Sequence, residues 1–235
     1  MKYKVIDGKG IILDGTNEIA ESAFKGCTRL QSIVIPGSVT VIGSEAFSGC
    51  TSLQSIVIPD SVTRINYSAF SGCNNLTSII VSKNNSRYKS TNNCILTKDG
   101  KKLILCRSHN IPDSVTMIGD WAFKGCTSLQ SIIIPDSVTS IGWAAFWGCT
   151  SLQSIVIPDS VTVIGGSAFS CTSLQSIVIP NGETRIDTST FEGCGGLQSI
   201  VIPDSVKEIG ESAFWHCIYN HRTTKTNQKY PSVNL

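Results

Sequence analysis

The sequence predicts an α/β solenoid, a single domain built as a stack of short repeated coils. The segment from Pro135 to Ile157, PDSVTSIGWAAFWGCTSLQSIVI, recurs with a period of 23 residues along most of the 235-residue chain. All eight phenylalanines fall at one position of this unit, each soon followed by a cysteine, and seven of the eight prolines fall at another. Self-similarity with a period of about 20–50 residues is the signature of a solenoid, in which each coil is buried against its neighbours.

The second part of each copy predicts a short β-strand. Leu152, Ile155 and Ile157 form the pattern L-x-x-I-x-I, which matches the core of a leucine-rich repeat. The alternation in this segment favours a strand with one buried face. The following proline lacks a backbone donor and ends the pairing, and the Asp-Ser pair after it is expected to turn the chain through hydrogen bonds from side chain to backbone. Stacked side by side, these strands predict one parallel β-sheet on the concave side.

The first part of each copy predicts short helical turns on the convex side. Val-Thr-x-Ile-Gly adds inward apolar residues, and Ala-Phe-x-Gly-Cys is typical of one or two helical turns that end at a glycine. The phenylalanine fills the core between coils. We expect the repeated cysteines to form a column of buried free thiols that act as small apolar side chains, because a disulfide would need neighbouring Cα atoms within about 7 Å and suitably aimed side chains.

Three segments depart from the repeat, within a single solenoid that spans residues 1–217. Residues 1–17 contain two apolar stretches around Asp7-Gly8 and predict two short strands that cap the first coil. Residues 82–110 predict an inserted β-hairpin that turns at Asp99-Gly100. Residues 218–235 are polar and basic, as in a frayed tail or a partial cap.

Local irregularities leave further expectations open. A three-residue loop in the hairpin would place Cys94 opposite Cys106 for a disulfide, whereas a two-residue turn would place them diagonally as reduced, packed thiols. Copy six reads Phe169-Ser170-Cys171 and lacks the glycine that precedes the cysteine in the pattern Phe-x-Gly-Cys. We expect Cys171 to occupy the position of this copy in the thiol column. Copy seven has Glu183 at an apolar position, where the carboxylate should swing outward or find a partner. We interpret both copies as local kinks.

Two of the copies, SVTSIGWAAFWGCTSLQSIVIPDSV and SVTVIGSEAFSGCTSLQSIVIPDSV, resemble the BspA-like leucine-rich-repeat family of bacterial and protist surface proteins. The resemblance covers about residues 18–82 and 111–217. It implies a non-enzymatic cell-surface or secreted adhesion protein that binds host matrix proteins or other cells. Hairpin interruptions like residues 82–110 also occur in that family, which supports an inserted element over a second domain.

The composition excludes several classes of function. Residues 1–211 carry 16 basic and 17 acidic side chains, which gives no basic footprint for nucleic acid in the body of the repeat. No apolar run reaches the roughly 18 residues of a membrane span. The repeated residues form ladders instead of a convergent set of unlike groups, so that no catalytic, cofactor or metal site is expected. The N-terminus lacks the apolar core of a signal peptide, which keeps a cytoplasmic protein–protein interaction scaffold open as the alternative function.

Two sets of outward-facing positions are candidates for contact with a partner, which we expect to be a protein, with a glycan as the second choice. The strands present β-branched residues beside glutamines, an apolar stripe of the kind that marks interaction surfaces; their uniformity is equally explained by recent duplication of the repeat. All four tryptophans lie in variable positions around phenylalanine, and exposed tryptophan is enriched at binding hot spots. Alternatively they pack against the groove between coils or against the insert, and Trp143 and Trp147 share one face if their turn is helical. The candidates are Ile133, Val156, Val178, Val201, Gln130, Gln153, Gln175, Gln198, Trp121, Trp143, Trp147 and Trp215.

Overall fold

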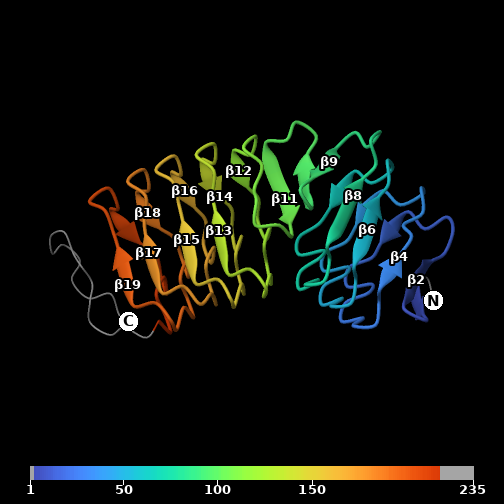
Figure 1. Cartoon of the computed structure of the whole chain (residues 1–235), viewed down its shortest axis with the longest axis horizontal. Coiled ribbons are helices and arrows are strands. Elements are labelled where there is room, and N and C mark those ends of the chain that lie inside the picture. Colours follow the sequence, from blue (N-terminus) through green and yellow to red (C-terminus); the bar gives the residue numbers. More distant parts are fainter. Residues whose placement is uncertain (1–2, 218–235) are drawn as a thin grey trace. The chain divides into compact units, whose positions relative to one another are not determined.

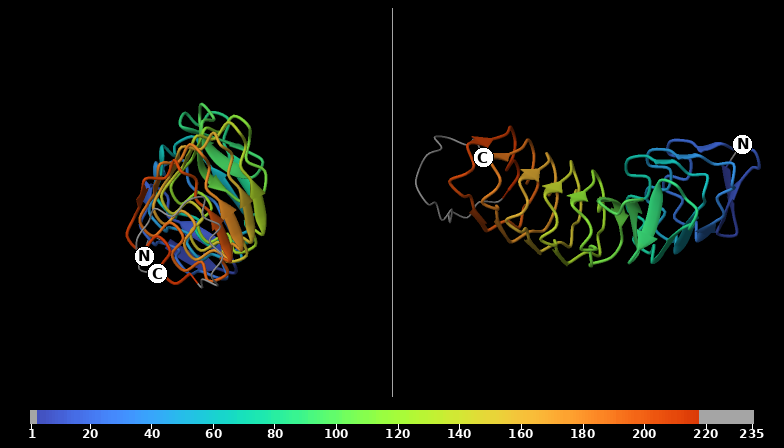
Figure 2. Two further views of the ribbon diagram at one scale, coloured as in Figure 1. Left: turned by 90° about the vertical axis from the view of Figure 1, so that its left-hand side faces the viewer. Right: turned by 90° about the horizontal axis from the view of Figure 1, so that it is seen from above.

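The computed structural model describes residues 3–217, and within this range it contains strands and turns but no helix. The chain divides into two compact units, Met1–Ser108 with Trp121–Cys126, and His109–Asp120 with Thr127–Leu235. Each unit is a β-solenoid whose coils stack one behind another (Figures 1 and 2). The prediction of a single continuous solenoid over residues 1–217 stays a prediction, and the expected tail at residues 218–235 lies outside the described residues.

In the first unit, an N-terminal hairpin precedes two ladders of parallel strands. The strands expected around Asp7-Gly8 are β1 and β2, which pair antiparallel, and β2 then pairs in parallel with β4. The strands β6 and β8 pair in parallel, as do β3, β5 and β7. The bounds are β1 (Tyr3–Ile6), β2 (Lys9–Ile12), β3 (Glu18–Ile19), β4 (Ser32–Ile33), β5 (Val41–Ile42), β6 (Ser55–Ile58), β7 (Arg64–Ile65) and β8 (Ser78–Val81).

The second unit repeats both ladders. One is formed by the pairs β13–β15 and β17–β19, and the other by β12–β14–β16 and β18–β20, all parallel. The partners are one copy apart, for example Ser131 with Ser154 and Ile132 with Ile155. The bounds are β12 (Met117–Ile118), β13 (Ser131–Ile133), β14 (Ser140–Ile141), β15 (Ser154–Val156), β16 (Val163–Ile164), β17 (Ser176–Val178), β18 (Arg185–Ile186), β19 (Ser199–Val201) and β20 (Glu208–Ile209).

The second ladder is a feature that the sequence interpretation missed. It is formed by the x-Ile pair of the Val-Thr-x-Ile segment, which we treated only as a source of inward apolar residues. Its strands are two residues long, too short for any alternation to be visible. Next to it, the Asp-Ser turn also differs from expectation. The serine hydroxyl bonds the preceding coil, as when Ser137 donates to the Val115 carbonyl and Ser160 to the Val138 carbonyl, while the aspartates remain exposed.

The expected helical turns around phenylalanine are wrong. In each copy, the residue two before phenylalanine and the residue two after it have positive φ, with values from 49° to 73°, which an α-helix does not contain. The amides of Ser22, Phe24 and Gly26 donate to carbonyls of the next coil, and the amides between them donate to carbonyls three residues back. Half of the donors are therefore used between coils, which makes this segment a third ladder of the solenoid.

The phenylalanine rings form the centre of each core, as predicted. In the second unit, the rings of Phe146, Phe169, Phe191 and Phe214 stack nearly parallel with centroids 5.4 to 5.6 Å apart. In the first unit, Phe24, Phe47 and Phe70 stack in the same way. Offset stacking at this spacing adds to the gain from burial of each ring. The period of 23 residues thus places one ring at the same height in every coil.

The insert is a three-stranded antiparallel sheet in the first unit, not a lone hairpin. Its strands are β9 (Tyr88–Thr91), β10 (Cys94–Thr97) and β11 (Lys102–Cys106), with β10 in the middle. A bulge after Ile95 shifts the register and brings Cys94 opposite Cys106, and the two form a disulfide. The reduced, diagonal arrangement that we also considered is thereby corrected, because a bulge replaces the longer loop.

The thiol column is present, but its membership in copy six is corrected. The thiols of Cys50, Cys73 and Cys194 are buried, and each donates to the carbonyl of the phenylalanine one copy before it. Cys171 is exposed and takes the positive-φ position that glycine holds in other copies, with φ 56°. Thr172 fills the vacated place in the core, where its hydroxyl donates to the Phe169 carbonyl. The missing residue therefore moves the sulfur from the core to the surface.

This difference predicts which thiols react. Burial, together with neighbouring thiols, raises the pKa of Cys50 to about 12, and burial raises the pKa of Cys73 to about 11. Partial burial also raises the pKa of Cys171, but only this one of the three thiols is exposed. Because an accessible thiolate is the nucleophile, native protein at pH 8 should be alkylated at Cys171 well before Cys50 or Cys73, as followed by peptide mass mapping over time. The Cys171→Ser variant should lose the first phase, and equally rapid labelling of Cys50 in native protein would contradict the assignment.

Glu183 is buried, so of the two outcomes expected for it, an outward side chain or a hydrogen-bond partner, the structure has the second. Its side chain is 4% exposed, and its Oε1 accepts hydrogen bonds from the amides of Thr184 and Arg185. Its Oε2 is buried without a hydrogen-bond partner in the described part of the chain. The carboxylate thus finds partners for one oxygen only, within its own turn.

Candidate recognition surface

The outward side of β13, β15, β17 and β19, which we call the second-unit strand face, presents a column of apolar side chains. Each inward isoleucine of these strands is buried, whereas the β-branched residue after it is exposed. The exposed fractions are 75% for Ile133, 67% for Val156, 61% for Val178 and 40% for Val201. Four consecutive coils therefore each expose one apolar side chain at the same strand position.

Glutamine side chains run beside this column. Gln130, Gln153, Gln175 and Gln198 are all exposed. Their backbones join the coils, because each glutamine amide from Gln153 onward donates to the carbonyl of the glutamine one coil earlier. This pairing holds the side chains in register, and it makes the second-unit strand face an apolar stripe with a regular row of amide donors and acceptors at its edge.

The first unit exposes an equivalent column that we did not single out from the sequence. Its members are Val34, Val57 and Ile80, with exposed fractions of 81%, 52% and 52%. The signal was available, since these residues occupy the same repeat position as Val156. At the N-terminal end of the column, Ile6, Ile11, Ile33 and Val34 help to line a depression of about 340 Å³ between β2 and β4.

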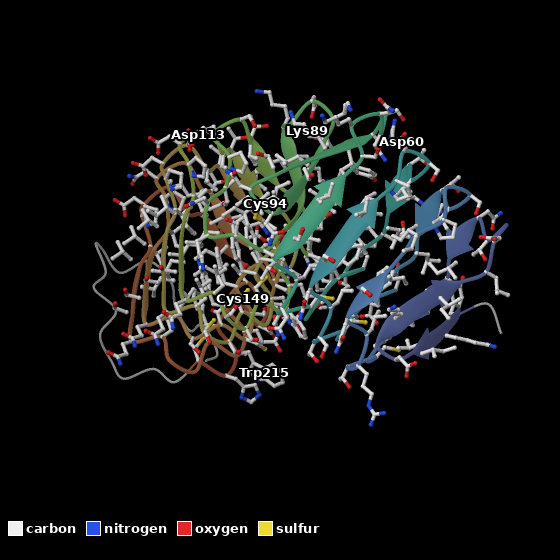
Figure 3. The ribbon with its side chains drawn as sticks, turned by 45° about the vertical axis from the view of Figure 1, so that its right-hand side comes forward. Asp60, Lys89, Cys94, Asp113, Cys149 and Trp215 are labelled. Carbon is white, nitrogen blue, oxygen red and sulfur yellow. A yellow bond between two sulfur atoms is a disulfide. The ribbon has the colours of Figure 1, made fainter. Side chains whose placement is uncertain are left out.

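The tryptophans lie on the phenylalanine turns, a different side of each coil from the strands. Trp143, Trp147 and Trp215 have exposed fractions of 49%, 39% and 51%, and Trp215 lies at the outer edge of the molecule in Figure 3. Because the turn is not helical, the helical argument for a shared face of Trp143 and Trp147 does not apply. The indole of Trp143 lies close to Gly166, where a β-carbon would approach its Cδ1 to 3.3 Å.

Trp121 differs from the other three because it belongs to a charged cluster in the first unit. Its ring is half-buried and lies 4.2 Å from the ammonium of Lys124. That ammonium is 3.8 Å from a carboxylate oxygen of Glu45, which also pairs with Lys25. The hydrogen bond from Lys25, with help from Lys124, holds the pKa of Glu45 below its usual value. Trp121 thus contacts a charged side chain of its own turn, and its role in binding a partner stays a prediction.

The chemically reactive side chains of the described residues recur in rows along the coils. Among residues 3–217, no group of three or more His, Cys, Asp or Glu side chains could hold a metal ion. The repeated aspartates, two of which are labelled in Figure 3, are exposed and separated along the array. No helix within the described range is long and apolar enough to cross a membrane. What the geometry offers is extended surface, built from the same side chains at each coil.

Comparison with known proteins identifies the repeat and its fold. The family model for the BspA type leucine rich repeat region matches residues 9–98 and 102–220, with six copies. A leucine rich cell surface protein from Faecalibacterium prausnitzii is 37% identical with a TM-score of 0.74, and the alignment covers 90% of this chain and 59% of that one. A leucine rich repeat protein of T. pallidum is 28% identical over 92% of this chain and 85% of that one, with a TM-score of 0.50.

A more distant structure shows the fold alone. The pneumococcal vaccine antigen PcpA is 20% identical with a TM-score of 0.55, over 85% of this chain and 52% of that one. No curated protein sequence matches the chain. The family model covers most of the sequence and matches residues in both units. The chain belongs to the BspA-type leucine-rich-repeat family.

Proposed function

We propose that this chain is a non-enzymatic recognition protein of the cell surface or the secreted fraction, and that its second-unit strand face binds a protein of the host matrix or of another cell. The exposed column of Ile133, Val156, Val178 and Val201 is the observation that carries the proposal. Neighbouring strands lie about 4.8 Å apart, so the column extends over roughly 15 Å. Apolar stripes of this kind on a soluble surface mark interaction sites.

The composition of the face suits a protein partner. Exposed β-branched side chains are restricted in χ1 and lose little freedom when they are covered. The glutamine row supplies polar contacts at the rim of the apolar stripe, which is the usual anatomy of a protein interface. The tryptophans Trp143 and Trp147 form a second candidate contact on the turn side, where a sugar ring or a protein would be stacked.

An intracellular interaction scaffold is the second candidate, and the eight cysteines outside the disulfide favour it. The disulfide between Cys94 and Cys106 favours an oxidising compartment instead, as does the likeness to a relative described as a cell surface protein. Alkylation of living cells before lysis discriminates between these two locations. Reduced Cys94 and Cys106 in a protein recovered from the cell interior would support the scaffold.

The strand face is tested by a double charge substitution. Val156→Asp with Val178→Asp should weaken binding to purified matrix proteins at least about tenfold, since it places two carboxylates in the centre of the apolar stripe. The matched control is Val163→Asp, which changes an exposed valine of the same unit on the other ladder and should leave binding unchanged. Binding is followed by surface plasmon resonance against a matrix-protein panel.

Two outcomes would redirect the proposal. Full binding by the Val156→Asp/Val178→Asp variant removes the second-unit strand face as the site. Loss of binding in Trp143→Ala/Trp147→Ala, with the strand variant unaffected, moves the site to the phenylalanine turns.

A further inference from the structure

The insert has a charge unlike that of the rest of the chain. Residues 82–110 contain seven Lys or Arg residues and one acid, Asp99, whereas the remainder has 12 basic and 16 acidic residues. A chain with a formal charge of +2 thus consists of a segment at +6 and a body at −4. Surfaces of one sign concentrate ions of the other.

The fold gathers six of these cations in the first unit, on the β8–β9 and β10–β11 loops and on the adjoining ends of β9 and β11. The amide of Lys98, in the β10–β11 turn, donates to the Arg87 carbonyl of the β8–β9 segment. Its ammonium donates to the carbonyls of Lys83 and Asn85 at 3.2 and 2.6 Å. The labelled Lys89 lies at the outer rim of the ribbon in Figure 3. We call this surface the basic insert patch, and its members are Lys83, Arg87, Lys89, Lys98, Lys101 and Lys102.

The patch carries little internal compensation. The Asp99 carboxylate accepts hydrogen bonds from the Thr97 hydroxyl and the Lys101 amide, and these bonds, helped by Lys89 and Lys101, lower its pKa. None of the ion pairs found within residues 3–217 involves Lys83, Arg87, Lys89 or Lys102. Lys83, Arg87 and Lys101 are exposed. Like charges within a Debye length of about 8 Å repel one another, so this clustering does not stabilise the fold.

The patch is also held in place before any ligand arrives. The buried Asn85 amide donates to the carbonyls of Pro59 and Val62, and its Oδ1 accepts from the amides of Arg87 and Tyr88. The Cys94–Cys106 disulfide closes the other end of the β10–β11 hairpin. Both loops are thus anchored to rigid elements, which lowers the entropy lost when an anion binds.

We propose that the basic insert patch binds a sulfated polysaccharide of the heparin type. Such a chain carries closely spaced sulfates, which match several cations on two adjoining loops, and basic clusters of this size suit heparin or nucleic acid. Binding of single-stranded nucleic acid uses exposed aromatic rings for base stacking, but Tyr88, the only Phe, Tyr or Trp residue of the insert, is 9% exposed, and its hydroxyl donates to the Thr63 carbonyl. The exposed neutral neighbours Asn84 and Ser86 suit the hydroxyl and sulfate oxygens of a sugar. This site is separate from the strand face of the proposed function and does not depend on it.

The test compares two triple variants of equal charge in the full chain. Lys83→Ala/Arg87→Ala/Lys101→Ala removes three cations of the patch, and Lys4→Ala/Lys9→Ala/Arg29→Ala removes three exposed cations elsewhere in the same unit. Binding to immobilised heparin is measured from 50 to 300 mM NaCl, with desulfated heparin, single-stranded DNA and anionic vesicles as competitors. We expect a loss on the order of tenfold or more for the patch variant and a salt slope flattened by about 2, since each lost contact contributes about 0.7.

Each outcome decides the proposal. It stands if the control triple keeps wild-type affinity, if Lys83→Arg/Lys101→Arg binds normally, and if desulfated heparin fails to compete. It falls if the full chain does not bind heparin near physiological salt, or if both triples lose affinity equally. It also falls if DNA or vesicles compete more strongly than heparin itself. Equal thermal midpoints of the variants show that the fold is intact.

Discussion

Phe169→Ala should destabilise the second unit by about 3–5 kcal/mol, the usual cost of a cavity left by a buried aromatic side chain. The Phe169 ring is fully buried and stacks on two neighbours, Phe146 at 5.4 Å and Phe191 at 5.6 Å. Its removal opens a gap in the middle of the column, where packing from either side cannot close it. Urea unfolding followed by circular dichroism at fixed temperature measures the loss.

The width of the urea unfolding transition reports how tightly neighbouring coils are coupled. In a solenoid each coil contacts only its neighbours, so that stability adds along the stack. We therefore expect Phe169→Ala to broaden the unfolding transition as well as to lower its midpoint, because the coils on either side become less tightly coupled. Trp215→Ala is the control, since its side chain is 51% exposed and should change stability by less than about 1 kcal/mol. A loss below 1 kcal/mol for Phe169→Ala would contradict the role of the ring column.

Glu183→Gln should stabilise the protein at neutral pH by about 1 kcal/mol, because the variant removes a charge from a buried site where Oε2 has no partner among the described residues. Burial raises the pKa of the Glu183 carboxyl, although the amides of Arg185 and Thr184 oppose the shift. A carboxyl with a raised pKa in the folded state binds its proton more tightly there than in the unfolded state. The wild-type protein therefore loses stability as the pH rises through the folded pKa of Glu183.

Because the pKa of Glu183 is raised in the folded state, the stability gained by Glu183→Gln depends on pH. The advantage of Glu183→Gln is expected in full at pH 7 and should shrink as the pH falls toward 4.5 and below, where the wild-type carboxyl is protonated in both states. Paired urea titrations at pH 7 and pH 4 measure it, with the exposed Glu211→Gln as the control. An equal gain at both pH values would show that charge is not the cause.

The frame of the fold could be predicted from the sequence because it depends on periodicity alone. A phenylalanine ring at a fixed position of each copy and an inward isoleucine pair after each leucine are all buried when equivalent residues of neighbouring coils lie side by side. The parallel pairing of Ser131 with Ser154 and of Ser176 with Ser199 has this register. The exposed positions followed from the same alternation. Their role in binding a partner stays a prediction, since exposure is a property of the strand and recognition is a property of a pair of molecules.

The largest error, the expected helical turns, has its physical origin in hydrogen bonds between coils. Ala-Phe-x-Gly-Cys has the composition of a helix end, yet its alternate amides donate to the neighbouring coil, for example Phe47 to the Ala69 carbonyl. In copy six, Thr172 takes the core place of the cysteine, and its hydroxyl donates to the Phe169 carbonyl of its own copy. The bulge after Ile95 decided the pairing of Cys94 with Cys106. The first depends on contacts between coils and the other two on a single missing or extra residue, and the composition of a segment predicts neither.

The ladder of alternate amides has a consequence for how such a protein changes its length. Within each unit, the carbonyls of one Phe turn accept hydrogen bonds from the preceding coil, and the amides of the same turn donate to the next coil. The Ser48 carbonyl thus accepts from the Gly26 amide, and the Ser71 carbonyl accepts from the Gly49 amide. A gene segment that encodes one whole coil can therefore be duplicated or lost while every new junction repeats an existing one. Recombination can therefore change the length of a unit by whole coils without any change in the hydrogen bonds between neighbouring coils.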